Sequence, residues 1–98
     1  MKKEYVPNPI DTSDVIVPKS LEDLTEKLAK NVHENWAKGR ISEGWVYGEE
    51  RAESVKTTPC LVEYEDLPEN EREYDRRTSM ETIKLIIKLG YEIRKKGD

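Results

Sequence analysis

The sequence predicts a small α+β domain with two principal helices, a short helical piece and a few short antiparallel strands. Apolar residues recur at intervals of three or four within 21–36 and 80–90, which is the period of an amphipathic helix. The stretch 44–64 lacks this period and carries short β-prone runs bracketed by glycine and proline, which is typical of strands and ordered loops. At 98 residues, the chain is predicted to form one domain with a modest core.

The first nineteen residues are predicted to be extended or turned. They contain three of the five prolines and the polar group 11–14, whose short side chains bond to the local backbone in turns. The β-branched run Val15–Val17 predicts an edge strand. Pro18 is expected to end this strand because proline has no backbone N–H to donate.

The first principal helix is predicted to begin at Leu21 and to end at Gly39. Ser20 precedes it in a Ser-x-x-acid pattern, which caps the first turn of a helix, and glycine suits the left-handed conformation after a last turn. Five side chains at helical spacing form its predicted apolar face, namely Leu21, Leu24, Leu28, Val32 and Trp36.

Short elements are predicted between the two principal helices. Trp45–Tyr47 and Cys60–Tyr64 are β-prone, and the charged interval 49–58 between them predicts an exposed loop. Pro68 is expected in the first turn of a short helical piece over 69–74.

The second principal helix is predicted over Ser79–Leu89. Thr78 and Ser79 repeat the capping pattern, and Gly90 is a suitable end. Tyr91–Ile93 then predicts a last short strand.

Composition argues against several classes of protein. The most apolar run, 83–89, is interrupted by Lys84 and Lys88, so no membrane span is predicted. The net charge of −4 predicts no nucleic-acid partner. A single cysteine cannot form an internal disulfide, and the first residues lack the apolar stretch of a secretory signal, so a cytoplasmic location is expected.

Several blocks along the chain, in order and with compatible spacing, resemble the RyR repeat, a family named after the ryanodine receptor. The blocks are Asn31–Ala37, Gly44–Gly48, Pro59–Val62, Leu67–Pro68, Glu71–Asp75 and Leu89–Tyr91. The resemblance defines a single repeat over residues 9–93, with an N-terminal extension at 1–8 and a charged C-terminal tail at 94–98.

The resemblance implies a non-enzymatic module. RyR repeats occur as tandem pairs in the cytosolic shell of calcium-release channels, away from the pore, so a chain with one repeat is not itself a channel. A cleft between the paired repeats is associated with adenine nucleotides and drug-like molecules. The resemblance therefore implies either binding of a small nucleotide-like ligand, or a protein-interaction module in which a homodimer or another RyR-repeat partner supplies the missing half.

The preferred candidate site is one side of the first helix. His33 and Trp36 lie one turn apart and Arg40 follows one turn later. An indole offers a stacking face to a base, and a guanidinium offers donors to phosphate. The resemblance points to the same His-x-x-Trp face. The alternative is that Trp36 completes the apolar stripe and that His33 packs against a loop.

Four further residues are candidate ligand contacts. Trp45 and Tyr47 share one face of a strand and form either an aromatic platform or core packing. Lys56 could meet phosphate and Asp75 could accept a hydrogen bond from a base or ribose, and the alternative for both is a solvated surface charge.

No catalytic residue, cofactor or metal site is predicted. One His and one Cys are too few for a zinc site, and the glycines do not form a phosphate-binding fingerprint. Cys60 lies in an apolar block, which favours a buried small side chain over a nucleophile. The run 76–79 resembles a basophilic kinase site, but a helix cap at Thr78 or Ser79 accounts for the same residues.

Overall fold

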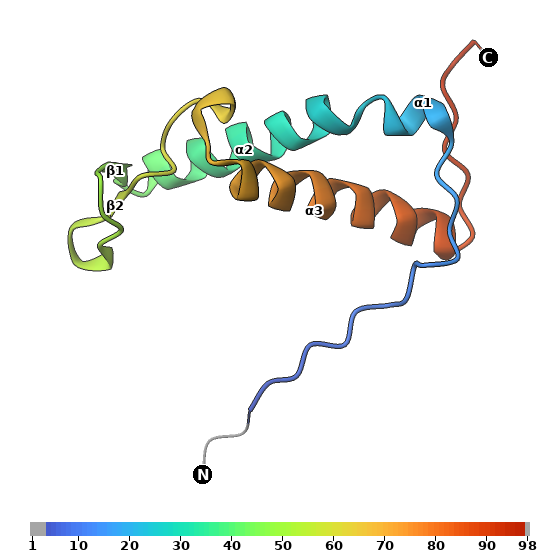
Figure 1. Cartoon of the computed structure of the whole chain (residues 1–98), viewed down its shortest axis with the longest axis horizontal. Coiled ribbons are helices and arrows are strands. Elements are labelled where there is room, and N and C mark those ends of the chain that lie inside the picture. Colours follow the sequence, from blue (N-terminus) through green and yellow to red (C-terminus); the bar gives the residue numbers. More distant parts are fainter. Residues whose placement is uncertain (1–3, 98) are drawn as a thin grey trace.

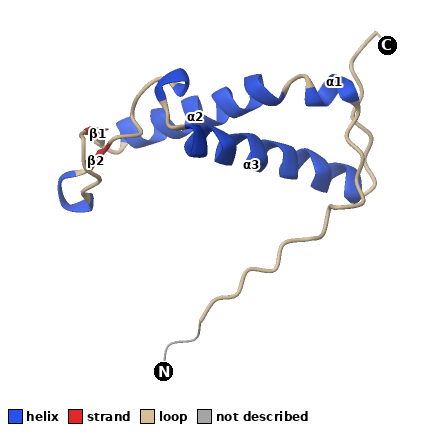
Figure 2. Cartoon of the chain, in the orientation of Figure 1, coloured by secondary structure: helices blue, strands red, loops and turns tan. Residues whose placement is uncertain are grey.

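The computed structural model describes residues 4–97 and is dominated by two long helices that run in opposite directions (Figures 1 and 2). These are α2 (Thr25–Ser42) and α3 (Glu69–Lys88), which pack against each other. A short helix, α1 (Lys19–Glu22), precedes α2. The segment that connects the long helices, residues 43–68, contains β1 (Val46–Tyr47), the 3-10 turn η1 (Glu53–Val55), β2 (Thr57–Thr58) and the 3-10 turn η2 (Tyr64–Asp66).

The fold is mostly helical, and the prediction of antiparallel strands was wrong. β1 and β2 pair in parallel, with Val46 opposite Thr57 and Tyr47 opposite Thr58. Within residues 4–97, the runs predicted as strands at 15–17, 60–64 and 91–93 contain no strand. β-branched and aromatic residues favour a strand only where a neighbouring edge offers hydrogen bonds. A sheet of two residues per strand offers almost none.

The two principal helices are confirmed, but the boundaries of the first differ from the prediction. A turn at 23–24 separates α1 from α2, and Ser20 lies inside α1, whose N-cap is Pro18. Gly39 lies inside α2, which continues to Ser42. Gly44 instead takes the positive φ of 93° beyond the helix end. The local signals at Ser20 and Gly39 were therefore overridden by the packing of longer segments.

The predicted short helical piece and second principal helix form one continuous helix, α3. Pro68 is its N-cap, and Gly90, with a φ of 100°, follows its end as predicted. Ser79 is not a cap: it is buried within α3, and its hydroxyl donates to the carbonyl of Asp75 at 2.9 Å. A serine can make this bond inside a helix as well as at its start, so the capping pattern alone does not locate a boundary.

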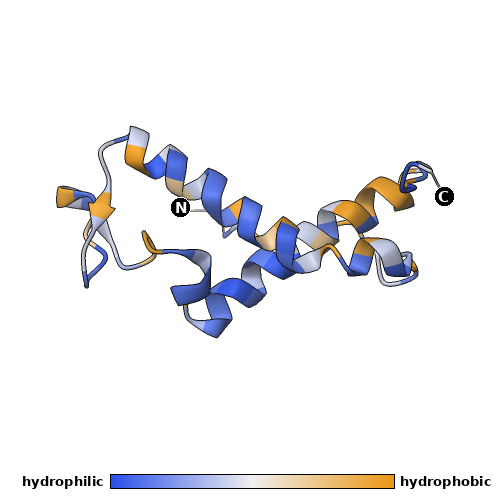
Figure 3. Cartoon of the chain, turned by 90° about the horizontal axis from the view of Figure 1, so that it is seen from above, coloured by the Kyte–Doolittle hydropathy of each residue, from blue (hydrophilic) through white to orange (hydrophobic). Residues whose placement is uncertain are grey.

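The apolar core is small and lies between α2 and the connecting segment. Ala29, Tyr64 and Leu67 are buried together, with Cys60 and Val62 packed against them. The predicted apolar face of the first helix is only partly buried, because Leu24 and Val32 are 39% and 37% exposed while Ala29 and His33 are 0% and 4% exposed. Figure 3 shows the hydrophobic positions concentrated in the C-terminal half of α3 rather than along α2.

A charged cluster joins α2, η2 and α3 beside this core. The Tyr64 hydroxyl donates to Glu26 at 3.1 Å, and Arg76 binds Glu26 as well as Glu69, which it meets at 2.6 Å. The hydrogen bond from Arg76 lowers the pKa of the Glu26 carboxyl and also that of Glu69. These carboxylates contribute stability at neutral pH, and the contribution is lost as the pH falls through their lowered pKa values.

The N-terminal segment is tied to α3 at residues 11–14. The buried Thr12 hydroxyl donates to Glu81 at 2.7 Å, and Lys88 pairs with Asp14 at 2.9 Å. Residues 4–10 then lead away from the helices (Figure 1).

Substitution Gly48→Ala is expected to destabilise the β1–β2 pair. A Cβ at Gly48 would lie 2.6 Å from the Cβ of Thr57, so the paired backbones must separate, at a cost of about 1–3 kcal/mol. Gly39→Ala is the matched control, because a Cβ at this helical position meets nothing within 4 Å and should stabilise α2 by about 0.5–1 kcal/mol. Urea unfolding measures both changes. Equal stability of Gly48→Ala and the unsubstituted protein would contradict the close pairing.

Candidate functional site

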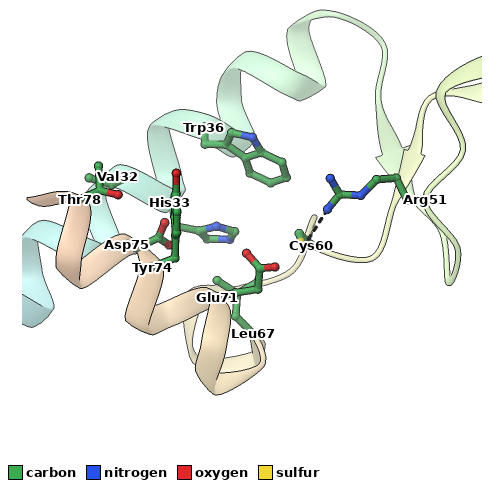
Figure 4. A pocket seen from close by; sticks show the side chains of 10 residues that line it. All are labelled: Val32, His33, Trp36, Arg51, Cys60, Leu67, Glu71, Tyr74, Asp75 and Thr78. Atoms are coloured by element: carbon green, nitrogen blue, oxygen red, sulfur yellow. Dashed lines mark hydrogen bonds between the residues drawn. The ribbon is translucent and has the colours of Figure 1, made fainter. Parts of the chain in front are cut away.

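A cavity of about 260 Å³ lies between α2, α3 and the connecting segment. Figure 4 shows side chains from all three directed toward it. Among its lining residues are His33 and Trp36 from α2, Glu71 and Asp75 from α3, and Arg51 and Cys60 from the connecting segment. The helical residues come in pairs spaced three or four positions apart, so each pair shares one face of its helix.

His33 forms the innermost aromatic wall of the cavity. Its side chain is 4% exposed, and its Nε2 lies 2.6 Å from the carbonyl oxygen of Val62. A carbonyl only accepts hydrogen bonds, so Nε2 is the donor. The imidazole also stacks on Trp36, with centroids 5.6 Å apart and an interplanar angle of 23°. His33 therefore combines a satisfied core position with a place in the cavity wall.

Trp36 is half-buried and lies between His33 and Arg40. The guanidinium carbon of Arg40 is 5.8 Å from the Trp36 ring centroid and 5.0 Å from that of Trp45. Its Nη1 also lies 3.6 Å from Glu43. These contacts hold Arg40 against two indoles. Arg40 does not itself line the cavity, but it supports the Trp36 ring that does.

Three of the seven predicted contact residues line the cavity, and four do not. His33, Trp36 and Asp75 are brought together, whereas Arg40, Trp45, Tyr47 and Lys56 lie elsewhere. Trp45 is buried under Arg40, as the core-packing alternative predicted, whereas Tyr47 is 55% exposed, so that alternative is wrong for Tyr47. Lys56 adopts a left-handed φ of 53°, and its Nζ donates to the Glu43 carbonyl at 2.8 Å at the end of α2.

The wall formed by α3 is acidic. Glu71 and Asp75 are one turn apart and face the cavity (Figure 4). Burial raises the pKa of the Asp75 carboxyl; His33 opposes this shift and the neighbouring Glu71 adds to it. None of the ion pairs of α3 within residues 4–97 involves either of these two carboxylates. The cavity thus presents hydrogen-bond acceptors that form no ion pair within the described residues.

Reasoning from the sequence missed Arg51, Cys60, Glu71 and Tyr74 as lining residues. Glu71 lies one helical turn before Asp75, and that spacing could have identified it. Arg51 reaches the rim because the connecting segment folds back through β2, and its guanidinium lies 3.9 Å from the Cys60 sulfur. No local sequence pattern signals this approach. Cys60, predicted as buried, is half-buried at the cavity wall.

The described part of the chain has neither a cluster of metal ligands nor a membrane-spanning helix. Residues 4–97 contain no group of three or more His, Cys, Asp or Glu side chains arranged to hold a metal ion. None of their helices has both the length and the apolar character that crossing a membrane requires.

Two long helices with an aromatic and acidic cavity between them define a small helical module with a pocket between its helices. Its volume is just below the roughly 300–1,000 Å³ of pockets for drug-sized molecules, so a ring-sized part of a ligand fits inside. The chain matches the family model of the RyR domain over residues 5–95, which is nearly its whole length. The protein therefore belongs to the RyR domain family, and the resemblance noted in its sequence is confirmed.

Proposed function

We propose that this RyR domain is a non-enzymatic, cytoplasmic module that binds a small nucleotide-like ligand. The observation that carries the proposal is the meeting of the Trp36 indole with the carboxylates of Glu71 and Asp75 in one cavity. A nucleobase has a flat face that stacks on an indole and N–H groups at its edge that donate to carboxylates. The base is the part of such a ligand that matches this lining.

The sugar and phosphate would lie toward the rim, beside Arg51. This side chain is exposed, and within residues 4–97 its guanidinium makes one hydrogen bond, the long contact of 3.9 Å with the Cys60 sulfur. A guanidinium suits phosphate because it presents several donors in one plane. Arg51 therefore takes the role that the sequence suggested for Arg40 and Lys56, whose charged groups are engaged by the indoles and by the end of α2.

Thermal unfolding in the presence of nucleotides tests the proposal. The panel comprises adenine and guanine nucleotides, ADP-ribose and cyclic dinucleotides, with ribose 5-phosphate as the control that lacks a base. A ligand at about ten times its Kd stabilises the folded state by about 1.4 kcal/mol, or about 5–10 °C for a domain of this size. No shift with any nucleotide at millimolar concentration, or an equal shift with ribose 5-phosphate, would contradict base recognition.

Substitution Asp75→Asn is expected to weaken nucleotide binding while stabilising the unliganded fold at neutral pH. Burial raises the Asp75 pKa, so the folded state favours the protonated acid. The favourable contribution is present at low pH and is lost as the pH rises through the raised pKa. Asparagine has no charge to bury, so its melting temperature should exceed that of the unsubstituted protein at pH 7.

Melting curves recorded between pH 7 and pH 4 check the Asp75 prediction. The difference in melting temperature should shrink as Asp75 becomes protonated, because all other carboxylates are common to both proteins. A lower melting temperature for Asp75→Asn at pH 7, or unchanged affinity for the nucleotide that binds best, would contradict the assigned role.

Protein interaction is a second candidate function, favoured by apolar side chains that the fold leaves on its surface. Ile41, Leu89 and Tyr91 are each at least 61% exposed. Association in the absence of any nucleotide, together with no thermal shift from any nucleotide of the panel, would favour this function over ligand binding as the primary role.

A further inference from the structure

We propose that two copies of the chain associate by exchanging their N-terminal arms, defined as residues 4–10. Each arm docks in the groove that the root of the other copy's arm forms with α3. This groove, called the arm groove, is lined by Pro9 and Ile10 on one side and by Thr78, Thr82 and Leu85 on the other. The proposal does not rest on ligand binding in the cavity, although Thr78 lines both the cavity and the arm groove.

The chain exposes more surface than a compact monomer of its mass would expose, and a second copy can cover part of the excess. The chain exposes 8,170 Å², whereas a folded monomer of 11.4 kDa is expected to expose about 5,800 Å². Its radius of gyration is 16.8 Å against about 13 Å expected for this length. The excess of about 2,400 Å² exceeds the roughly 800 Å² that each partner buries in a standard stable interface.

The arm carries apolar side chains that its own chain does not cover. Tyr5, Val6 and Ile10 are 82%, 78% and 55% exposed. Pro7 and Pro9 restrict φ to about −65° and so keep the arm extended as it leads away from α3 (Figure 1). A segment that is already stiff loses little conformational entropy on docking.

The arm groove offers a matching receptor. Its volume is about 620 Å³, which is room for the Tyr5 and Val6 side chains of another arm. Arg77 also lines the groove, and it takes part in no ion pair among the described residues. Its guanidinium carbon lies 5.9 Å from the centroid of the Tyr74 ring. Glu4 at the outer end of an incoming arm supplies the charge complementary to Arg77, while the carboxylate of Glu81, which also lines the groove, accepts from the Thr12 hydroxyl and pairs with Lys84.

Symmetry identifies a second copy as the occupant. The arm and the groove share Pro9 and Ile10, so donor and receptor surfaces lie side by side on one face of the chain. A two-fold axis next to these residues places each arm in the other copy's groove at the same time. Such an isologous contact closes after two copies and leaves neither arm exposed.

Sedimentation equilibrium from micromolar to submillimolar concentration tests the exchange. Val6→Asp places a charge on the arm and should weaken dimerisation at least tenfold, with the melting temperature of the dilute protein unchanged. Val55→Asp is the matched control, because Val55 is similarly exposed, at 66%, but lies in η1; it should leave the dimer intact. A monomer at all concentrations, an unaffected Val6→Asp, or an equal effect of Val55→Asp would overturn the proposal.

Mixing two defective variants distinguishes arm exchange from other modes of dimerisation. Thr82→Glu alters the exposed groove side of α3 while leaving the arm intact, and Val6→Asp does the reverse. A heterodimer of the two retains one undamaged arm–groove contact, whereas each homodimer retains none. The mixture should therefore associate more tightly than either variant alone, and a mixture that does not would contradict exchange.

Discussion

Replacing His33 by alanine is expected to remove a large part of the free energy of unfolding of the protein. The side chain is 4% exposed, donates to the Val62 carbonyl at 2.6 Å and packs against Trp36 and Tyr64. Its removal leaves the partly buried carbonyl of Val62 unsatisfied, which costs about 1–3 kcal/mol, and opens a cavity in the core that adds to this cost. We expect a loss of about 3–4 kcal/mol, against a total stability of about 5–10 kcal/mol for a chain of this length.

Urea unfolding followed by circular dichroism measures the effect of His33→Ala. Asn35→Ala is the control, because this residue lies on the same helix and also bonds to a backbone carbonyl, that of Asn31 at 3.0 Å, but is exposed. Its replacement should change the stability by less than about 0.5 kcal/mol. A His33→Ala protein within 1 kcal/mol of the unsubstituted one would show that the bond to Val62 does not hold the connecting segment against α2.

Substitution Trp36→Ala is expected to weaken nucleotide binding strongly while leaving the protein folded. Loss of a base–aromatic stack costs about 1–3 kcal/mol, or about 5- to 150-fold in Kd. Trp36 is half-buried, so its removal should cost about 2 kcal/mol of stability, less than the about 3–5 kcal/mol of a fully buried indole. At a temperature where the variant is still folded, destabilisation alone would leave the affinity almost unchanged. A large loss of affinity there is therefore due to the missing stack.

Calorimetric titration at 15 °C, with unfolding curves for the same samples, separates the two effects of Trp36→Ala. Trp36→Phe retains a ring and should recover part of the affinity. Tyr47→Ala is the matched aromatic control, since Tyr47 is exposed and does not line the cavity. Unchanged affinity in Trp36→Ala, or an equal loss in Tyr47→Ala, would remove the indole from the site.

The two long helices could be predicted because their apolar periodicity spans several turns, whereas their ends depend on tertiary packing. Gly39 resembles a helix stop, yet α2 passes through it and turns at Gly44. Ser79 resembles a cap, yet it is buried within α3. A strand at Thr57–Thr58 could not be predicted, since two threonines in a charged loop carry no periodic signal and pair only because the loop returns to β1.

Some residues of the candidate site could be predicted from local sequence patterns, and others reach the site only through contacts between distant parts of the chain. The pairing of His33 with Trp36 follows from helical spacing, and Asp75 lies in a block shared with the RyR repeat. Helical spacing after Trp36 predicts a phosphate contact for Arg40, and charge predicts one for Lys56. Each instead makes a contact that forms only in the folded chain, Arg40 with the Trp45 indole and Lys56 with the Glu43 carbonyl. Arg51 enters the site through the path of the connecting segment, which no local pattern encodes.

The most direct test of the central claim is a titration of the protein with AMP and GMP, followed through the indole N–H signals in ¹H–¹⁵N NMR spectra. The chain has two tryptophans, of which Trp36 lines the cavity and Trp45 is buried outside it. A base that stacks in the cavity is predicted to shift the Trp36 signal in a saturable manner while the Trp45 signal stays nearly in place. Shifts of Trp45 alone, or of neither signal at millimolar nucleotide, would contradict nucleotide binding between α2 and α3.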